Sequence, residues 1–268
     1  MKIGSLFSGI GGLELGLERA TGGHTVWQVE QDPYARAVLA KHWPKAKRFE
    51  NVEKVGAHNL AAVDLICGGF PCQDVSNAGK RAGLDGARSG LWTEYARIIG
   101  DLRPRFVVVE NVSALLARGM DRVLGDLAAC GYDAIWDCIP AAAVGAPHRR
   151  DRLFVVAYSN SGWRSNNELQ TGGHKLRVCR TKLADTDGTR LERHRPAGNV
   201  GEICPQKAVG LFRRSLGHVE AWKLEPQLGR VATGVPRRVD RLRCLGNAVV
   251  PQVAEVIGRV IVELDRGR

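Results

Sequence analysis

The feature that most constrains the fold is an alternation of short apolar runs and amphipathic stretches over the first 157 residues. Such alternation favours a doubly wound, mainly parallel α/β sheet of Rossmann-like type, with helices on both faces. Ligands of these sheets bind at the carboxyl ends of the strands. The predicted strands are 3–7, 26–30, 63–67, 106–110, 134–139 and 153–157. The predicted helices are 12–20, 34–42, 91–101 and 120–130.

The alternation ends near residue 158. Residues 158–230 are polar and rich in turn-forming residues, and they contain 13 Lys and Arg against 7 Asp and Glu, an excess of six positive charges. Regular structure is expected to resume near Gly246. A helix there would place Val253 and Val256 on one side and pack on the domain formed by the first 157 residues. We therefore predict a discontinuous main domain, 1–157 plus 231–268, with 158–230 as a small irregular second region.

The composition restricts the partners and the setting of the chain. A net charge of +11 favours a polyanionic partner, although a solvated basic surface without a partner is the alternative. Seven cysteines with no CxxC pair argue against a disulfide framework and a zinc site. No secretory signal and no apolar run of membrane-spanning length is recognisable. We expect a reducing, cytoplasmic setting with no membrane partner.

A glycine-rich turn, SLFSGIGGLELGLE (5–18), follows the first predicted strand. It resembles a Rossmann-type loop, but its GxGG spacing departs from GxGxxG, and a turn required only for packing is the alternative. The next predicted strand ends in Glu30, where folds of this class place an acid on a ribose. Because no GxxxxGK[ST] loop occurs, a nucleoside with little phosphate fits better than ATP.

Cys72 lies in GGFPCQDVSNAG (68–79), directly after the third predicted strand. A disulfide, a metal-binding thiol and a nucleophile are the three interpretations, and the cysteine pattern disfavours the first two. A nucleophilic thiol needs a pKa lowered by nearby positive charge or by a helix start. The residues that could supply this charge are His148, Arg149, Arg150 and Arg152.

Two further segments bring charge to predicted strand ends. FVVVENV (106–112) runs into Glu110, and burial of such a carboxyl raises its pKa, which would let it hold or donate a proton near neutrality. PHRRDRLFVVA (147–157) brings Arg150 and Arg152 to the start of a strand. Taken alone, the first could be an exposed strand end and the second a surface charge cluster.

Together and in this order, these segments resemble the cytosine-C5 DNA methyltransferases of bacterial and phage type. The shared elements are LFSGIGG, GGFPCQ, ENV, an RRDR form of QxRxR in which His148 replaces glutamine, and a final LGNAVVPQ. The resemblance covers about 1–157 and 231–268. It implies that these residues form the catalytic, S-adenosylmethionine-binding domain and that 158–230 is the target-recognition region.

The resemblance also implies a mechanism. Cys72 would add to C6 of a cytosine flipped out of the duplex, C5 would accept a methyl group from S-adenosylmethionine, and loss of the C5 proton with elimination of Cys72 would follow. Glu110 would hold or donate a proton at N3, and Arg152 would anchor both the base and Glu110. The implied catalytic residues are Cys72, Glu110, Arg150 and Arg152, and the implied substrate-binding residues are Gln73 and Asn111.

For the cofactor, the resemblance implies that Phe7 stacks near the adenine and that Glu30 accepts the ribose hydroxyls. Asn51, in FENV, stands where the family often has an aspartate for the adenine amino group, and its amide oxygen could accept the same hydrogen bond. The implied cofactor-binding residues are Phe7, Gly9, Ile10, Gly11, Gly12, Glu30, Asn51, Pro71, Leu91, Asn247 and Ala248. No metal ligand is implied.

The substrate implied by the resemblance is double-stranded DNA, with phosphates bound by the basic excess of 158–230 and base edges read by a few of its side chains. We expect a monomer, with a cognate restriction endonuclease as a candidate partner. Two alternatives stay open: the same chemistry on RNA, and a catalytically silent DNA-binding protein with this fold. The presence together of Cys72, Glu110 and Arg152 argues against the silent form.

Overall fold

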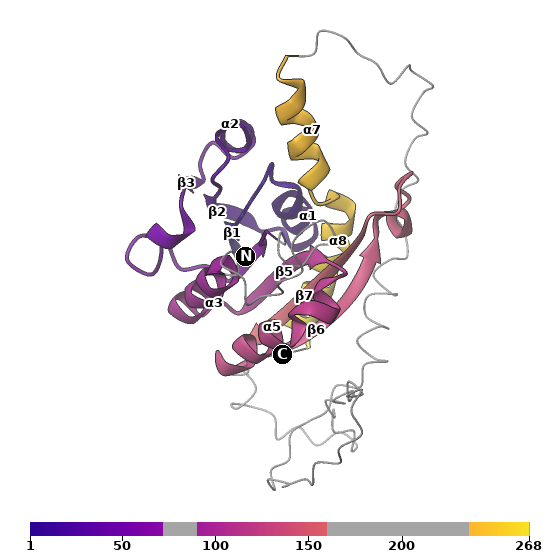
Figure 1. The fold of residues 1–268 in the computed structure, drawn as a ribbon. Helices are drawn as coiled ribbons and strands as arrows, with labels where there is room; N and C mark the ends of the chain where they lie inside the picture. Colours follow the sequence, from indigo (N-terminus) through magenta and orange to yellow (C-terminus); the bar gives the residue numbers. More distant parts are fainter. Residues whose placement is uncertain (72–89, 160–235, 268) are drawn as a thin grey trace, which may run out of the picture.

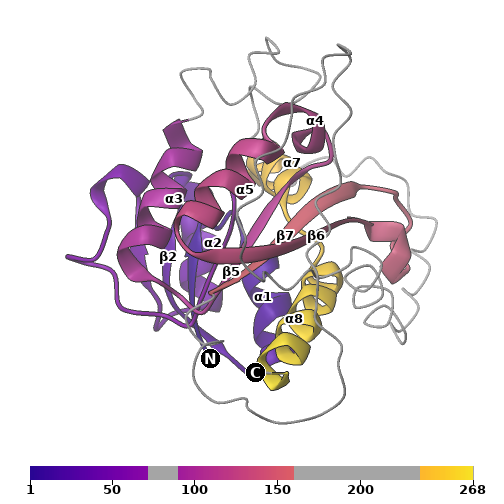
Figure 2. The same ribbon diagram turned by 90° about the horizontal axis from the view of Figure 1, so that it is seen from below.

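The computed structural model describes residues 1–71, 90–159 and 236–267 (Figure 1). Predictions about Cys72, Gln73 and nearly all of 158–230 lie outside the described residues. In the described part, one sheet of seven strands forms the centre of the molecule, and helices cover both of its faces (Figures 1 and 2). The predicted fold class, a doubly wound and mainly parallel α/β sheet, is confirmed.

The sheet has the strand order β3-β2-β1-β4-β5-β7-β6. The strands are β1 (Lys2–Leu6), β2 (His24–Val29), β3 (Lys47–Phe49), β4 (Leu65–Gly69), β5 (Phe106–Val112), β6 (Tyr132–Pro140) and β7 (Asp151–Ser159). The first five run parallel to one another. The predicted strands are all present, whereas β3 has no counterpart among them because three residues are too few to show an alternating pattern.

Strand β7 runs antiparallel to both of its neighbours. Its first residues therefore lie beside the last residues of β5, with Arg152 opposite Val112 and Phe154 opposite Glu110. The start of β7 thus reaches the same edge of the sheet as the carboxyl ends of the parallel strands. This arrangement brings the RRDR segment to the edge where ligands bind in such sheets.

Two pairs of helices sandwich the sheet (Figure 2). Helices α3 and α5 cover one face and bury residues such as Trp92 and Val123. Helices α1 and α8 cover the other and bury residues such as Leu17 and Val256. The helices are α1 (Gly12–Thr21), α2 (Pro33–His42), α3 (Gly90–Leu102), α4 (Leu115–Arg118), α5 (Met120–Ala129), α7 (Arg238–Asn247) and α8 (Pro251–Arg266), with 3-10 turns η1 (Val52–Lys54) and η3 (Ala141–Val144).

Helix α8 packs closely on α1 because glycines stand at their contact. A Cβ on Gly16 would lie 2.2 Å from the Pro251 carbonyl oxygen, and one on Gly258 would lie 2.5 Å from the Ala20 Cβ. The valines predicted to share one side of this helix include Val253 and Val256, and both are buried. The C-terminal segment therefore belongs to the same core as the first strands. The domain boundaries near 158 and 230 stay a prediction, since 160–235 is not described.

Helix α7 was not expected from the sequence, where regular structure begins only near Gly246. Its apolar residues Val239, Leu242 and Leu245 recur every three residues but are exposed, while Cys244 is buried. Taken as one span, Arg238–Arg266 is the one helical stretch of the described residues that is long and apolar enough to cross a membrane. Residues 248–250 interrupt it, and the apolar side of α8 is buried against α1 and the sheet, as in a core helix of a soluble protein.

Replacing Gly16 with alanine is expected to lower the free energy of unfolding by about 1–3 kcal/mol, because the added Cβ cannot fit against α8. The matched control is Gly125→Ala on α5, where a Cβ would meet no atom within 4 Å. That change is expected to raise the free energy by roughly 0.5–1 kcal/mol through helix propensity. Urea unfolding, monitored by circular dichroism, measures the free energy of unfolding of both variants. Equal stabilisation by the two substitutions would contradict close packing at Gly16.

Candidate active site

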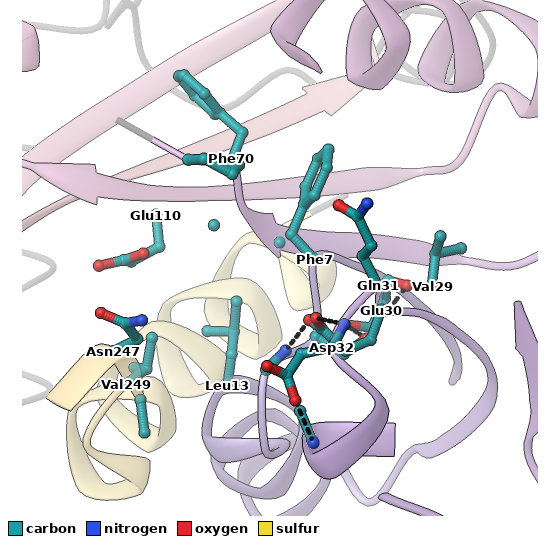
Figure 3. Close-up of a pocket in the computed structure, with 18 of the residues that line it drawn as sticks. Phe7, Leu13, Val29, Glu30, Gln31, Asp32, Phe70, Glu110, Asn247 and Val249 are labelled. Atoms are coloured by element: carbon teal, nitrogen blue, oxygen red, sulfur yellow. Dashed lines mark hydrogen bonds between the residues drawn. The ribbon is translucent and has the colours of Figure 1, made fainter. Parts of the chain in front are cut away.

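A cavity of about 610 Å³ lies at the carboxyl edge of the sheet, bounded by the ends of β1, β2, β4 and β5 and by the α7–α8 junction. Figure 3 shows Phe7, Glu30, Glu110 and Asn247 around this space. The structure thus brings together residues from all five segments that carry the resemblance. The predicted site residues that line the cavity are Phe7, Gly9, Gly12, Glu30, Asn51, Pro71, Leu91, Glu110, Asn111, Arg152, Asn247 and Ala248.

Three predicted site residues do not line this cavity. Ile10, Gly11 and Arg150 line a neighbouring cavity of about 510 Å³, which shares Gly12, Ala248 and Val249 with the first. Gly11 serves as the N-cap of α1 with a φ of 88°, a conformation that favours glycine. Cys72 and Gln73 lie outside the described residues.

The loop after β1 holds an aromatic ring in the cavity by means of unusual backbone conformations. Phe7 has a φ of 54° and Gly9 a φ of 56°. The left-handed region is costly for a bulky residue such as phenylalanine, and residues held in it cluster at functional sites. Figure 3 shows the Phe7 ring projecting between the Glu30 side and the Glu110 side of the cavity.

The carboxylate of Glu30 is fixed by two backbone N–H groups. Gly9 N donates to Glu30 Oε2 at 2.7 Å and Asp32 N donates to Oε1 at 2.8 Å. These bonds join the end of β2 to the glycine loop and leave lone pairs on both oxygens for further donors. Such a held carboxylate suits recognition of a pair of hydroxyl groups.

Asn51 lies after β3 and caps the 3-10 turn η1. Its Oδ1 accepts a hydrogen bond from Glu53 N at 2.8 Å, and its side chain lines the cavity. A carbonyl oxygen has two lone pairs, so this oxygen can accept a second hydrogen bond. Leu91, near the start of α3, also lines the cavity.

Glu110 and Arg152 form an ion pair at the far side of the cavity from Glu30. Arg152 Nε lies 3.1 Å from Glu110 Oε1, and the Glu110 side chain is 13% exposed. Burial raises the pKa of Glu110 from 4.5 to about 7, while Arg152 and then Arg150 act to lower it. Gly69 leaves room for this carboxyl, because a Cβ on Gly69 would lie 2.4 Å from Glu110 Oε2 in its present position. The site therefore contains an acid that changes protonation near neutral pH.

Asn111 fixes the backbone just before Cys72. Its Nδ2 donates to the Phe70 carbonyl at 3.1 Å, and its Oδ1 accepts from Val112 N at 2.9 Å. Asn111 is 3% exposed, and the Phe70 ring packs on Trp92 with centroids 5.3 Å apart. The segment that leads to Cys72 is thus tied to β5 on one side and to α3 on the other.

Arg150 connects the β6–β7 loop to the α7–α8 junction. It has a φ of 38°, and its Nη2 donates to the Ala248 carbonyl at 2.8 Å. Arg150 also lowers the pKa of Glu110, so its charge acts on the main cavity from the adjacent one. Of the other expected cations, Arg149 pairs with Asp151 at 3.3 Å and His148 lines the adjacent cavity.

Several charged residues of the cavity were not expected from the sequence. Asp32 caps α2 and pairs with Arg243 of α7, and Glu14 of α1 is completely buried at the cavity. In the sequence, Glu14 adjoins Leu13 on the buried side of α1, and an acid on a predicted apolar face is the signal that could have identified it. The lining acids are Glu14, Glu30, Asp32, Glu50, Glu53 and Glu110, and the lining bases are Arg152 and Arg243.

Fold and site together define an α/β protein with a cavity at the carboxyl edge of its sheet, where a titratable acid is paired to an arginine. The family model for C-5 cytosine-specific DNA methylase matches residues 1–198. The chain belongs to this family, and the resemblance noted from its sequence is confirmed.

Two Type II methyltransferases are similar to this chain in sequence. The Type II methyltransferase M2.BsuMI of Bacillus subtilis (strain 168) is 39% identical over 166 residues, which make up 59% of this chain and 42% of the relative. The Type II methyltransferase M.NgoPII of Neisseria gonorrhoeae is 36% identical over 164 residues, 59% of this chain and 48% of the relative. The matched part therefore spans less than half of either relative.

Among solved structures, a candidate DNA modification methyltransferase encoded within a prophage (E. coli) superposes with a TM-score of 0.61 at 18% identity, covering 99% of both chains. The methyltransferase EhMeth of Entamoeba histolytica gives a TM-score of 0.61 at 15% identity, covering 98% of both chains. At these identities the similarity concerns the fold.

Proposed function

We propose that the protein is a sequence-specific DNA (cytosine-5-)-methyltransferase. The observation that carries this proposal is the partly buried Glu110–Arg152 pair, which lines the same cavity as Phe7 and Glu30 and as Pro71, the residue before Cys72. One end of the cavity thus offers a carboxyl group and a guanidinium group for a pyrimidine ring. The other end offers an aromatic ring and a fixed carboxylate for a nucleoside.

On the base side, Cys72 is the proposed nucleophile toward C6 of a flipped cytosine. Glu110 would hold or donate a proton at N3, which favours addition because negative charge builds up on the ring. Arg152, 3.1 Å from Glu110, would anchor that carboxyl and the base by charge-assisted hydrogen bonds. Gln73 is the proposed further base contact.

Asn111 and Arg150 are proposed to act mainly through other groups. Both polar atoms of the Asn111 side chain already bind the backbone, so its proposed role is to position the Phe70–Cys72 segment beside the base. Arg150 would hold the α7–α8 junction at Ala248 and add positive charge near Glu110 and Cys72. Such charge lowers the pKa of a thiol.

The residues on the other side of the cavity fit S-adenosylmethionine. Six acids and two arginines line the cavity in a chain whose net charge is +11, which suits a cationic ligand better than a polyphosphate. Phe7 would stack on the adenine. Glu30 would accept hydrogen bonds from the ribose hydroxyls, and Asn51 would accept one from the adenine amino group. The remaining proposed contacts come from Gly9, Ile10, Gly11, Gly12, Pro71, Leu91, Asn247 and Ala248. When bound, this cofactor supplies the methyl group.

Double-stranded DNA is the proposed substrate. The basic excess of 158–230, proposed as the target-recognition region, would bind phosphates. Among described residues, Arg238 and Arg241 are exposed on α7 and are proposed as further phosphate contacts. The names of the similar Type II methyltransferases support a cognate restriction endonuclease as a functional partner. We propose a monomer that acts in the cytoplasm.

One assay tests the proposed function. The full chain is incubated with methyl-labelled S-adenosylmethionine and, separately, with duplex DNA, single-stranded DNA and tRNA, and 5-methylcytosine is mapped in each product. We expect label only at one cytosine within a recurring sequence of duplex DNA. Label in tRNA alone would favour the RNA alternative. Binding of duplex DNA without labelling of any polymer would indicate a catalytically silent protein.

A further inference from the structure

Glu14 has no place in the roles described so far, although it is the most buried acid of the cavity. It lies in the first turn of α1, it is 0% exposed, and it lines the cavity beside Ser5, Ser8 and Gly12. Neither of its carboxylate oxygens has a hydrogen-bond partner among the described residues. A buried carboxylate without donors is costly, and a ligand that provides donors would lower this cost.

The other acids of the cavity have polar partners. Glu30 accepts hydrogen bonds from two backbone N–H groups. Asp32 accepts hydrogen bonds from backbone N–H groups in the first turn of α2. Glu50 pairs with Arg36 at 2.7 Å, and Glu110 pairs with Arg152. Glu53 is exposed to solvent. Glu14 therefore differs from the rest in being both fully buried and unpartnered within the described chain.

The groups that face Glu14 do not neutralise it. Burial raises the pKa of Glu14 from 4.5 to about 7, and the charge of Glu18 acts in the same direction. Ser5, the Glu14 backbone and Ser8 act to lower this pKa, but none of them reaches a carboxylate oxygen with hydrogen-bond geometry. The Ser8 hydroxyl instead donates to Ser5 Oγ at 2.9 Å. On β4, the neighbouring Cys67 thiol is buried, and burial followed by the charge of Glu14 raises its pKa. The surroundings thus consist of hydroxyls, a thiol and a second acid.

We propose that Glu14 binds the α-ammonium group at the methionine end of S-adenosylmethionine. An ammonium offers three N–H donors to the two free carboxylate oxygens, whereas the sulfonium offers none. The inference rests on the proposed function, because it concerns the cofactor of that reaction. In Figure 3, Leu13, the residue before Glu14, lies between the Glu30 side and the Glu110 side. An amino acid attached to a nucleoside on Glu30 would extend into this region.

The test compares two ligands that differ in the amino-acid portion. S-adenosylhomocysteine carries the ammonium and carboxylate groups, and 5′-methylthioadenosine lacks both. For Glu14→Gln we expect the Kd of S-adenosylhomocysteine to rise about 10- to 100-fold, the effect of losing a hydrogen bond to a charged group. The Kd of 5′-methylthioadenosine should stay within about twofold. Isothermal titration calorimetry on the full chain measures both constants.

A pH series adds a second measurement. Because the ammonium stays charged while Glu14 takes up a proton below about pH 7, the native protein should lose affinity for S-adenosylhomocysteine between pH 8 and pH 6. Glu14→Gln should lack this loss, and 5′-methylthioadenosine should not show it with either protein. The control variant is Glu263→Gln, an exposed acid of α8 that does not line the cavity, and it should leave the ratio of the two Kd values unchanged.

Three outcomes would overturn the inference. An equal loss of affinity for both ligands in Glu14→Gln would assign the residue a merely structural role, and thermal unfolding of the variant would show the accompanying destabilisation. Unchanged affinity for both ligands would show that Glu14 does not meet the ammonium. If the native chain bound neither compound, the proposed function itself would fail and the inference with it.

Discussion

Serine in place of Cys72 is expected to reduce DNA methylation by at least about 10⁴-fold, the scale on which loss of a catalytic nucleophile acts. A serine hydroxyl is not ionised near neutral pH, whereas the thiol of cysteine becomes a good nucleophile when nearby positive charge lowers its pKa. Because addition to C6 activates C5, the later steps would lose their substrate. Transfer of labelled methyl groups to duplex DNA measures the rate.

Covalent trapping shows whether the loss is due to the nucleophile. DNA with 5-fluorocytosine at the target has no removable C5 proton, so the native protein with S-adenosylmethionine should form an adduct that survives denaturing electrophoresis. Cys72→Ser should form none. The control is Cys130→Ser, a partly exposed cysteine that does not line the cavity, and it should retain both the adduct and the activity. Normal methylation by Cys72→Ser would disprove the proposed role.

Glutamine in place of Glu110 is expected to reduce kcat/KM for methylation by about 10²- to 10⁴-fold, the usual contribution of general acid–base catalysis. The amide has nearly the same shape, so it can still pack against Gly69 and Arg152, but it cannot transfer a proton to N3. Binding of S-adenosylhomocysteine should stay within about twofold, because Glu110 faces the base side. Equal losses in cofactor binding and catalysis would contradict this separation of roles.

The pH profile tests the same residue independently. Burial raises the pKa of Glu110 from 4.5 to about 7, so the carboxyl is mostly protonated at pH 6 and mostly ionised at pH 8. If the proton is needed at N3, kcat/KM of the native protein should fall as the pH rises through about 7. Glu110→Gln should lack that fall. An identical alkaline decrease in the variant would assign it to another group.

Local sequence patterns were sufficient for the strands and helices that build the sheet. Apolar runs such as 106–110 mark buried strands whichever neighbours they later acquire, and residues that follow them, such as Phe7, Glu30 and Pro71, meet because parallel strands end at one edge. The same patterns did not reveal α7, whose apolar residues are exposed, or β3, whose extended form depends on its pairing with β2.

Contacts between segments distant in the sequence required the folded chain. The approach of Arg152 to Glu110 depends on β7 running antiparallel to β5, and strand direction is set by pairing and loop path rather than by the pattern of the strand itself. The lack of a hydrogen-bond partner for Glu14 also depends on tertiary packing, since Ser5, Ser8 and Cys67 come from other segments of the chain. Residue types and their order were therefore enough to indicate the chemistry, but protonation states and unpaired groups follow from burial and from distances that only packing creates.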